Sequence, residues 1–138
     1  MPELYVSDID RSLRFYTELL GFAVLYDRPE ERFAYLDRDG AALMLDQPAD
    51  PGRLWLAGPL EPPYGRGVNL QIEVADVDTL NAAVLGVGTL IERPLEERWY
   101  RRGNTQVGQR QFVVQDPDGY LLRFCQPLGS RPAPPDGR

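Results

Sequence analysis

The chain has 138 residues, of which 43% are hydrophobic and 26% charged, and its net charge is −6 at pH 7. This length and composition are typical of one folded domain, or of two small halves that share a core. The sequence has no histidine, all 15 cationic side chains are arginine, and Cys125 is the single cysteine. These counts exclude imidazole metal ligands, histidine and lysine catalysis, and a disulfide within the chain.

The acidic balance offers no basic surface to nucleic acid or to an anionic membrane. No apolar run approaches the roughly 20 residues of a membrane span, and the start, Met-Pro-Glu, does not resemble a signal peptide. A lone cysteine suits a reducing compartment. We therefore expect a cytoplasmic protein with no nucleic-acid or membrane partner.

The first half of the chain reads as a strand, a helix and three strands. A strand at residues 3–6 precedes a helix that Ser7, Asp8 or Asp10 can cap. Apolar positions with helical spacing run to Leu20, and Gly21 ends the helix. Strands are expected at residues 22–26, 32–36 and 41–46, the last two joined by the turn Asp37-Arg-Asp-Gly40.

The second half repeats this order. A strand at residues 68–74 precedes a shorter helix at about 79–85, which Gly86 ends. Asp116-Pro-Asp-Gly119 is the turn before the last strand. The other expected strands are residues 89–93, 97–101, 109–115 and 120–125.

The two halves are copies of one unit. Residues 6–10, 28–33 and 37–47 recur in the same order as residues 74–78, 93–99 and 116–126. In the last pair, five of eleven positions are identical. The repeat predicts two βαβββ modules, at about residues 2–47 and 68–126. Within a single domain of residues 1–126, a Pro- and Gly-rich connector at 48–67 joins them, with Trp55 expected to pack over the sheet. Residues 127–138 are too poor in apolar side chains to fold and are predicted to be a disordered tail.

The duplicated module and two motifs resemble the vicinal oxygen chelate superfamily, which includes glyoxalase I, extradiol dioxygenases, fosfomycin-resistance enzymes and bleomycin-resistance proteins. Residues 6–22, VSDIDRSLRFYTELLGF, are similar to its first-helix signature, and residues 115–124, QDPDGYLLRF, to its final-strand signature. Residues 96–100 and 108–112 are similar to a bleomycin-resistance-like subgroup. The resemblance covers residues 2–126 and implies an α+β fold, in which a concave mixed sheet carries its helices on the outer face.

The resemblance also implies where a metal would be bound. In the superfamily's metalloenzymes, the ligands come from the first and last strands of each module. The matching positions here are Met1, Met44, Asn69 and Arg123. Thioethers, one amide and a guanidinium do not suit a divalent cation. We therefore expect no metal and no other cofactor in this cup, while a carboxylate-only site elsewhere, using Glu3, Glu73 or Asp46, stays open.

Strand alternation predicts what lines the cup instead. If Asn69 faces it, Gln71 and Glu73 do too, and the apolar residues between them face the helices. Phe33 and Trp99 stand in equivalent repeat positions and could clamp a flat or cationic group, although cross-strand packing explains them equally well. Tyr64, on the connector, could act as a lid. The predicted ligand-binding residues are Tyr5, Phe33, Asp46, Tyr64, Asn69, Gln71, Glu73, Trp99 and Arg123.

Three functions fit these observations to different degrees. The first is a metal-free binding protein resembling bleomycin-resistance proteins, a homodimer that sequesters a flat or cationic small molecule such as a bleomycin-type glycopeptide, and so confers antibiotic resistance. The second is a cofactor-independent isomerase or lyase acting on a polar metabolite, with Glu73 as base and Tyr5 or Arg123 stabilising charge. The third, a metalloenzyme, is disfavoured by the ligand positions. On this reading the protein is a binding protein rather than an enzyme.

Overall fold

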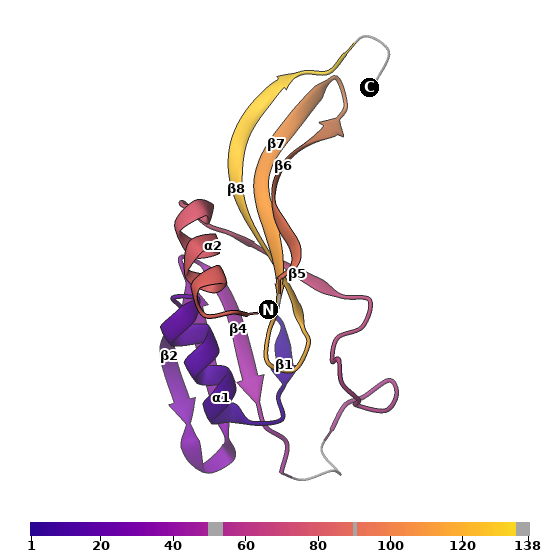
Figure 1. The fold of residues 1–138 in the computed structure, drawn as a ribbon. Helices are drawn as coiled ribbons and strands as arrows, with labels where there is room; N and C mark the ends of the chain where they lie inside the picture. The colour runs from indigo at the N-terminus through magenta and orange to yellow at the C-terminus, as the bar shows by residue number, and fades with distance from the viewer. Residues whose placement is uncertain (50–53, 90, 135–138) are drawn as a thin grey trace. The chain divides into compact units, whose positions relative to one another are not determined.

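The computed structural model describes residues 1–49, 54–89 and 91–134, and the chain divides into two units. The first unit is Met1–Val68 together with Asp116–Tyr120, and the second is Asn69–Gln115 together with the chain from Leu121 onward. Each unit contains a mixed sheet of four strands, built in the order βαβββ (Figure 1). The predicted α+β fold, made from two copies of one module, is confirmed.

The sheet of the first unit has the strand order β1-β4-β3-β2. Strand β1 is parallel to β4, and the other neighbours are antiparallel. The helix α1 continues directly into one π-helical stretch, η1, and a 3-10 turn, η2, joins β2 to β3. The elements are β1 (Glu3–Tyr5), α1 (Ile9–Arg14), η1 (Phe15–Leu19), β2 (Ala23–Arg28), η2 (Pro29–Glu31), β3 (Phe33–Arg38) and β4 (Ala41–Asp46).

The sheet of the second unit repeats this topology, with the order β5-β8-β7-β6 and β5 parallel to β8. In the part of the chain that is described, neither unit has a helix long and apolar enough to cross a membrane. The elements are β5 (Asn69–Glu73), α2 (Val77–Gly86), β6 (Ile91–Arg102), β7 (Thr105–Gln115) and β8 (Leu121–Pro132).

Both helices begin in the same way, and this explains part of the repeat. Asp8 accepts hydrogen bonds from the N–H groups of Asp10 and Arg11, and Asp76 accepts one from Thr79. A glutamine at the end of the module's last strand supplies a further acceptor. Gln47 Oε1 accepts from Ile9 N–H at 2.9 Å, and Gln126 Oε1 accepts from Val77 N–H at 3.0 Å. The first N–H groups of a helix have no partner within the helix. The aspartate and the glutamine are therefore both present in each module to accept hydrogen bonds from them.

The predicted alternation of strand faces is confirmed. In both units, the buried aliphatic and aromatic side chains of the parallel strand pair lie on the helix-facing side, and the opposite side is more exposed except at Cys125, which is buried. Tyr16 and Leu20 complete the first core from the helical segment. The buried strand residues on the helix-facing side are Leu4, Ala34, Leu36, Leu43 and Leu45 in the first unit, and Ile72, Phe112, Val114, Leu122 and Phe124 in the second.

Two sequence predictions are corrected in the second unit. The strands expected separately at residues 89–93 and 97–101 form the single strand β6. Residues 127–132, assigned above to a disordered tail, continue β8 and pair with β7 as far as Pro132 opposite Thr105. The strands β6, β7 and β8 therefore extend together as a long arm (Figure 1). Backbone pairing with a neighbouring strand, rather than a hydrophobic core, orders this polar segment. Residues 135–138 of the predicted tail and 50–53 of the connector lie outside the described residues.

Candidate functional site

A cavity of about 680 Å³ lies on the face of the first sheet that is opposite to its buried leucines. The register places Glu3 and Tyr5 of β1 beside Met44 and Asp46 of β4, and Phe33 of β3 on the other side of Asp46. We call this space the acidic cavity. Its lining residues are Glu3, Tyr5, Arg28, Glu30, Glu31, Phe33, Asp46, Gln47, Pro48, Ala49, Leu54 and Trp55.

Three of the predicted ligand-binding residues, Tyr5, Phe33 and Asp46, line this cavity together. Further rings extend along the same face, because Tyr26 of β2 pairs with Tyr35 of β3. These two rings stack at 5.0 Å between centroids, and Tyr26 also lies 6.2 Å from Phe33. The structure therefore places a row of aromatic rings beside the cavity floor. Such rings offer flat, polarisable surfaces to a planar ligand.

The cavity is acidic. Glu3, Glu30, Glu31 and Asp46 contribute four carboxylates, and Arg28 is the single cation among the lining residues described. Burial raises the pKa of Asp46, an effect that the nearby Arg28 guanidinium partly offsets. A cation entering the cavity would therefore meet an excess of negative charge and one carboxylate that is already partly desolvated.

Arg28 lies directly on the cavity floor. Its guanidinium carbon is 4.0 Å from the centroid of the Phe33 ring, and its Nε donates to Glu31 Oε2 at 2.6 Å. The strand register makes this contact, because Arg28 and Phe33 are directly opposed in the β2–β3 pair. Sequence reasoning missed this arginine as a site residue. The sequence did contain a signal for it. In the repeated stretch Arg28-Pro-Glu-Glu31, the arginine and the last glutamate are three residues apart, a spacing at which their side chains can pair.

Trp55 forms part of the cavity rim. Its backbone N–H donates to the Tyr5 hydroxyl at 3.2 Å, while the residue is 84% exposed. The expectation that Trp55 packs over the sheet is wrong for its side chain. An exposed indole at the mouth of an acidic cavity is instead available to a ligand.

The second unit brings four other predicted residues to one face of its sheet. Asn69, Gln71 and Glu73 alternate along β5, and Gln71 pairs with Arg123 of β8. Arg123 donates a hydrogen bond to the Gln71 side-chain carbonyl. On the same sheet, Gln111 donates to the Tyr100 hydroxyl at 2.7 Å. This face is a polar surface organised by side-chain amides, in contrast to the aromatic face of the first unit.

The predicted equivalence of Phe33 and Trp99 is wrong. Phe33 is on β3, opposite Asp46, and its counterpart in the second unit is Gln111 of β7, opposite Cys125. Trp99 is on β6, the counterpart of β2, and it lies across Gly108, where an added Cβ would meet the indole at 2.7 Å. The Arg131 guanidinium lies 4.0 Å from the ring of Trp99. Because the β6–β7 hairpin is long, the repeated motif that ends in Trp99 lies on β6 and not on β7, the counterpart of β3.

Tyr64, the predicted lid, packs against the turn Asp116–Tyr120 of the first unit. Its ring meets Tyr120 edge-on at 6.0 Å, and its N–H donates to the Asp118 carbonyl at 2.8 Å. Gly65 lies so close that an added Cβ would fall 2.5 Å from the Tyr120 ring. These contacts give Tyr64 a packing role in holding the connector.

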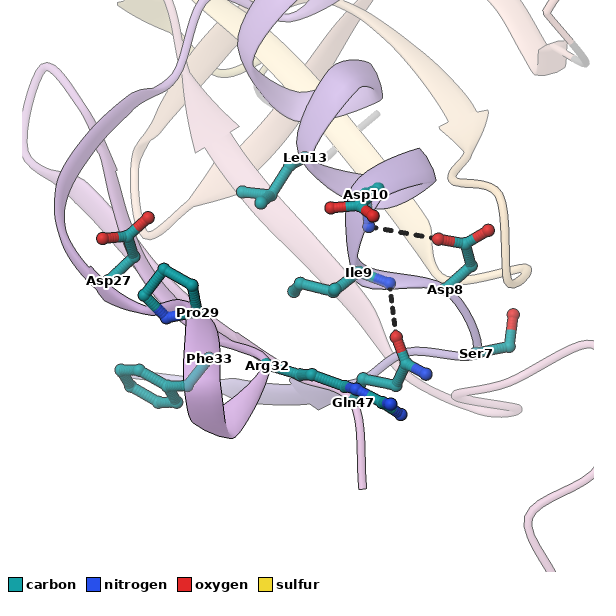
Figure 2. Close-up of a pocket in the computed structure, with 10 residues that line it drawn as sticks. All are labelled: Ser7, Asp8, Ile9, Asp10, Leu13, Asp27, Pro29, Arg32, Phe33 and Gln47. Carbon is teal, nitrogen blue, oxygen red and sulfur yellow. Dashed lines mark hydrogen bonds between the residues drawn. The ribbon is translucent and has the colours of Figure 1, made fainter. Parts of the chain in front are cut away.

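A second cavity, of about 620 Å³, lies between the start of α1 and the β2–β3 connection (Figure 2). It is lined by the three carboxylates Asp8, Asp10 and Asp27, with Arg32 and Gln47. One oxygen of Asp8 and one of Gln47 accept hydrogen bonds from the first N–H groups of α1. This opening therefore follows from the capping of the helix.

The residues at the superfamily's metal-ligand positions do not fit a divalent metal. The guanidinium of Arg123 occupies one position and is bonded to Gln71, so a positive charge stands where a cation would bind. Another position, Met44 of β4, offers a thioether, and Asn69 of β5 offers one neutral oxygen. Hard divalent ions prefer several oxygen ligands, chiefly carboxylates, and borderline ions such as Zn²⁺ prefer imidazole or thiolate.

The fold and these positions define the class of protein. The profile described as the Glyoxalase/Bleomycin resistance protein/Dioxygenase superfamily matches residues 1–124, and the chain belongs to that family. A bleomycin resistance protein from Geobacillus stearothermophilus is 29% identical in an alignment 139 positions long. The alignment covers 94% of this chain and 97% of the relative. A Staphylococcus aureus protein of the same name shows the same values.

Solved structures agree with this assignment. TioX from Micromonospora sp. ML1 is 27% identical, with a TM-score of 0.72 over 93% of this chain and 98% of TioX. A protein of unknown function from Agrobacterium tumefaciens is 28% identical, with a TM-score of 0.68 over 91% of this chain and 90% of that one. The resemblance is therefore to whole chains.

Proposed function

We propose that this protein binds and sequesters a flat, cationic small molecule without a metal, and that a bleomycin-type glycopeptide is one such ligand. The acidic cavity is the observation that carries the proposal. It combines four carboxylates with the Phe33 ring and the exposed Trp55, which together suit a ligand that is both planar and positively charged. Bleomycin resistance proteins that align with this chain almost end to end support the same ligand class.

The polar face of the second unit is proposed, by itself, as a further ligand-binding surface. Asn69, Gln71, Glu73 and Arg123 present amide, carboxylate and guanidinium groups that can hydrogen-bond the polar part of a ligand. Trp99, with its hydrogen bond from Nε1 to Glu97 at 3.0 Å, is proposed as an additional stacking surface. In this proposal Tyr64 contributes indirectly, because its contacts with the turn Asp116–Tyr120 hold the connector in place.

We further propose that the protein is a cytoplasmic homodimer. Strands β2 and β6 are sheet edges, and the side chains of Val24, Leu25 and Tyr26 on β2 are exposed. Open edges with apolar side chains are commonly covered by a second copy. Light scattering should report about twice 15.6 kDa, and a monomer mass at micromolar concentration would contradict the dimer.

The alternative function, a cofactor-independent isomerase or lyase, rests on Glu73 and Arg123, which lie on one face of the second sheet. Glu73 is exposed, whereas a general base gains efficiency from a site that excludes water. Binding is therefore the function that the geometry favours.

Calorimetric titration with metal-free bleomycin tests the proposal. We expect saturable binding that weakens as salt rises from 0.05 to 0.5 M, because screening shortens the reach of the carboxylates to about 4 Å. Phe33→Leu should weaken binding by roughly 1–2 kcal/mol at every salt concentration, because aliphatic carbon does not stack on the ligand. The change in bleomycin affinity of Trp99→Ala measures how much the second unit contributes to binding.

Two results would contradict the proposed function. One is the absence of binding by the folded wild-type protein to both metal-free and copper-loaded bleomycin. The other is turnover of a polar metabolite that Glu73→Gln abolishes while Phe33→Leu leaves it intact. A thermal-unfolding scan of each variant provides the control for folding.

A further inference from the structure

Arg28 occupies the most aromatic part of the acidic cavity in the free protein. It is the single cation among the lining residues described, and its cation–π contact and its ion pair are both with other lining residues. The Phe33 ring lies under the guanidinium carbon at 4.0 Å, and Glu31 accepts the Nε–H. Phe33 is itself only 7% exposed, and Arg28 lies over the face of its ring.

These contacts are those that a planar cationic ligand group would make. An aromatic face attracts a cation through its quadrupole, and a carboxylate beside the ring accepts a hydrogen bond from an N–H of that cation. A guanidinium or an amidinium satisfies both contacts at once, because its charge is delocalised over a plane edged with N–H donors. The side chain of Arg28 therefore shows which chemical group the cavity floor accepts.

The contacts of Arg28 are also easily broken. The Arg28 side chain is 43% exposed and that of Glu31 is 62% exposed, so solvent weakens their ion pair. The pair is local in sequence, three residues apart, and joins β2 to η2. Arg28 can thus leave the ring by side-chain rotation, with no change in strand pairing. An internal occupant of this kind reduces the apparent affinity for a ligand in proportion to the time that it fills the site.

We infer that Arg28 is a displaceable occupant of the ligand site, and that the group which replaces it on Phe33 is an amidinium or guanidinium. This inference rests on the proposed function and specifies which group of the cationic ligand reaches the cavity floor. Arg28 then selects against neutral flat molecules, because such molecules cannot replace both its cation–π contact and its bond to Glu31.

Benzamidinium is the probe, and benzamide is its neutral counterpart of nearly the same shape. We expect Arg28→Gln to bind benzamidinium about five- to tenfold more tightly than the wild type, the combined size of one exposed ion pair and one exposed cation–π contact. The affinity for benzamide should rise much less in Arg28→Gln. Arg14→Gln is the matched control, because Arg14 is an exposed arginine of α1 and its loss changes the net charge equally. It should change affinity less than twofold.

The wild-type protein supplies a second measurement that needs no variant. In a ¹⁵N-edited spectrum of arginine side chains, benzamidinium should shift the Nε–H resonance of Arg28 toward the position of exposed arginines, while benzamide should not. Phe33→Leu should abolish this shift, because the competition takes place on the ring.

The outcomes separate this inference from the proposed function. If Arg28→Gln binds benzamidinium no better than Arg14→Gln, or more weakly, the inference is overturned even where the wild type binds bleomycin. An Arg28 signal that does not move in saturating benzamidinium overturns it as well. Failure of every variant to bind benzamidinium, together with failure of the wild type to bind bleomycin, overturns both.

Discussion

The turns Asp37–Gly40 and Asp116–Gly119 share the pattern Asp-X-Asp-Gly, yet they lie in opposite environments within the first unit. In the first, Asp39 has a side chain that is 83% exposed, and a Cβ added at Gly40 would meet no atom within 4 Å. In the second, Asp116 and Asp118 are buried, at 5% and 7% exposure. One local motif thus serves as a solvent-exposed hairpin in one copy and as part of the core in the other.

The second turn is buried because the helical segment of the first module supplies its partners. Tyr16, fully buried, donates its hydroxyl proton to Asp116 Oδ2 at 2.8 Å, and Asp116 Oδ1 accepts from two N–H groups of its own turn. Asp118 accepts from the N–H and hydroxyl of Ser7 and from Arg11. The carboxylates of the first turn are exposed to solvent, whereas those of the second turn are the acceptors of a buried polar network.

Replacing the first aspartate of each turn should separate the two copies most clearly. Asp116→Ala leaves the Tyr16 hydroxyl and two backbone N–H groups without an acceptor, so we expect the free energy of unfolding to fall by about 3–4 kcal/mol. Asp37→Ala removes one exposed acceptor and should cost about 0.5 kcal/mol. Urea denaturation of both variants measures the difference. Equal losses would contradict the division into a structural and a solvent-exposed turn.

The glycines of the two turns provide a second comparison. Both have positive φ angles, +94° for Gly40 and +104° for Gly119, so alanine strains the backbone at either position by about 1 kcal/mol. At Gly119 an added Cβ would also meet the Pro63 Cβ at 2.5 Å and its Cα at 2.7 Å. We expect Gly119→Ala to lose about 3 kcal/mol in total. Thermal unfolding of the two alanine variants, side by side, isolates the steric part.

A smaller effect should appear in the pH dependence of stability. Burial raises the pKa of Asp116, partly offset by the hydrogen bond from Tyr16. The folded state therefore holds this proton more tightly than the unfolded state, and ionisation of Asp116 lowers stability as the pH rises from the unfolded pKa, about 4, to the folded one. Asp116→Asn removes this titration and keeps one oxygen to accept from the two turn N–H groups, while its NH₂ group faces the Tyr16 hydroxyl.

The stability of Asp116→Asn relative to wild type should consequently improve as the pH rises through that window, and level off above it. Urea midpoints measured between pH 3.5 and 8 test this sign. A relative stability of the asparagine variant that falls with rising pH would show that hydrogen bonding, and not burial, dominates at Asp116.

A modest effect is expected at Ser7. Its counterpart in the second module is Ala75, which follows the strand β5 as Ser7 follows β1. Ser7→Ala removes one hydroxyl donor to Asp118 and should cost about 1 kcal/mol, because Arg11 and the Ser7 N–H still satisfy the carboxylate. The same loss in an Asp118→Asn background would indicate that Ser7 acts independently of the charge on Asp118.

Several features of this protein follow from the sequence by itself. The ordered repeats predict two βαβββ modules, because a helix cap, a turn and the final glutamine are needed again in each copy. Strand alternation predicts that Tyr5 and Asp46 share one face and that Gln71 and Arg123 share another, since the side-chain period of a strand is two. The absence of histidine and lysine limits the available chemistry in the same direct way.

Other features depend on long-range pairing and were decided only by the tertiary structure. Trp99 lies on β6 and not opposite a counterpart of Asp46, because the β6–β7 hairpin is longer than the β2–β3 connection and changes the strand that carries the motif. Pairing of β8 with β7 likewise orders residues 127–132 despite their polar composition. Arg28 reaches the Phe33 ring because the β2–β3 register opposes them. A local pattern specifies which residues form an element, whereas hairpin length and strand register determine which side chains meet.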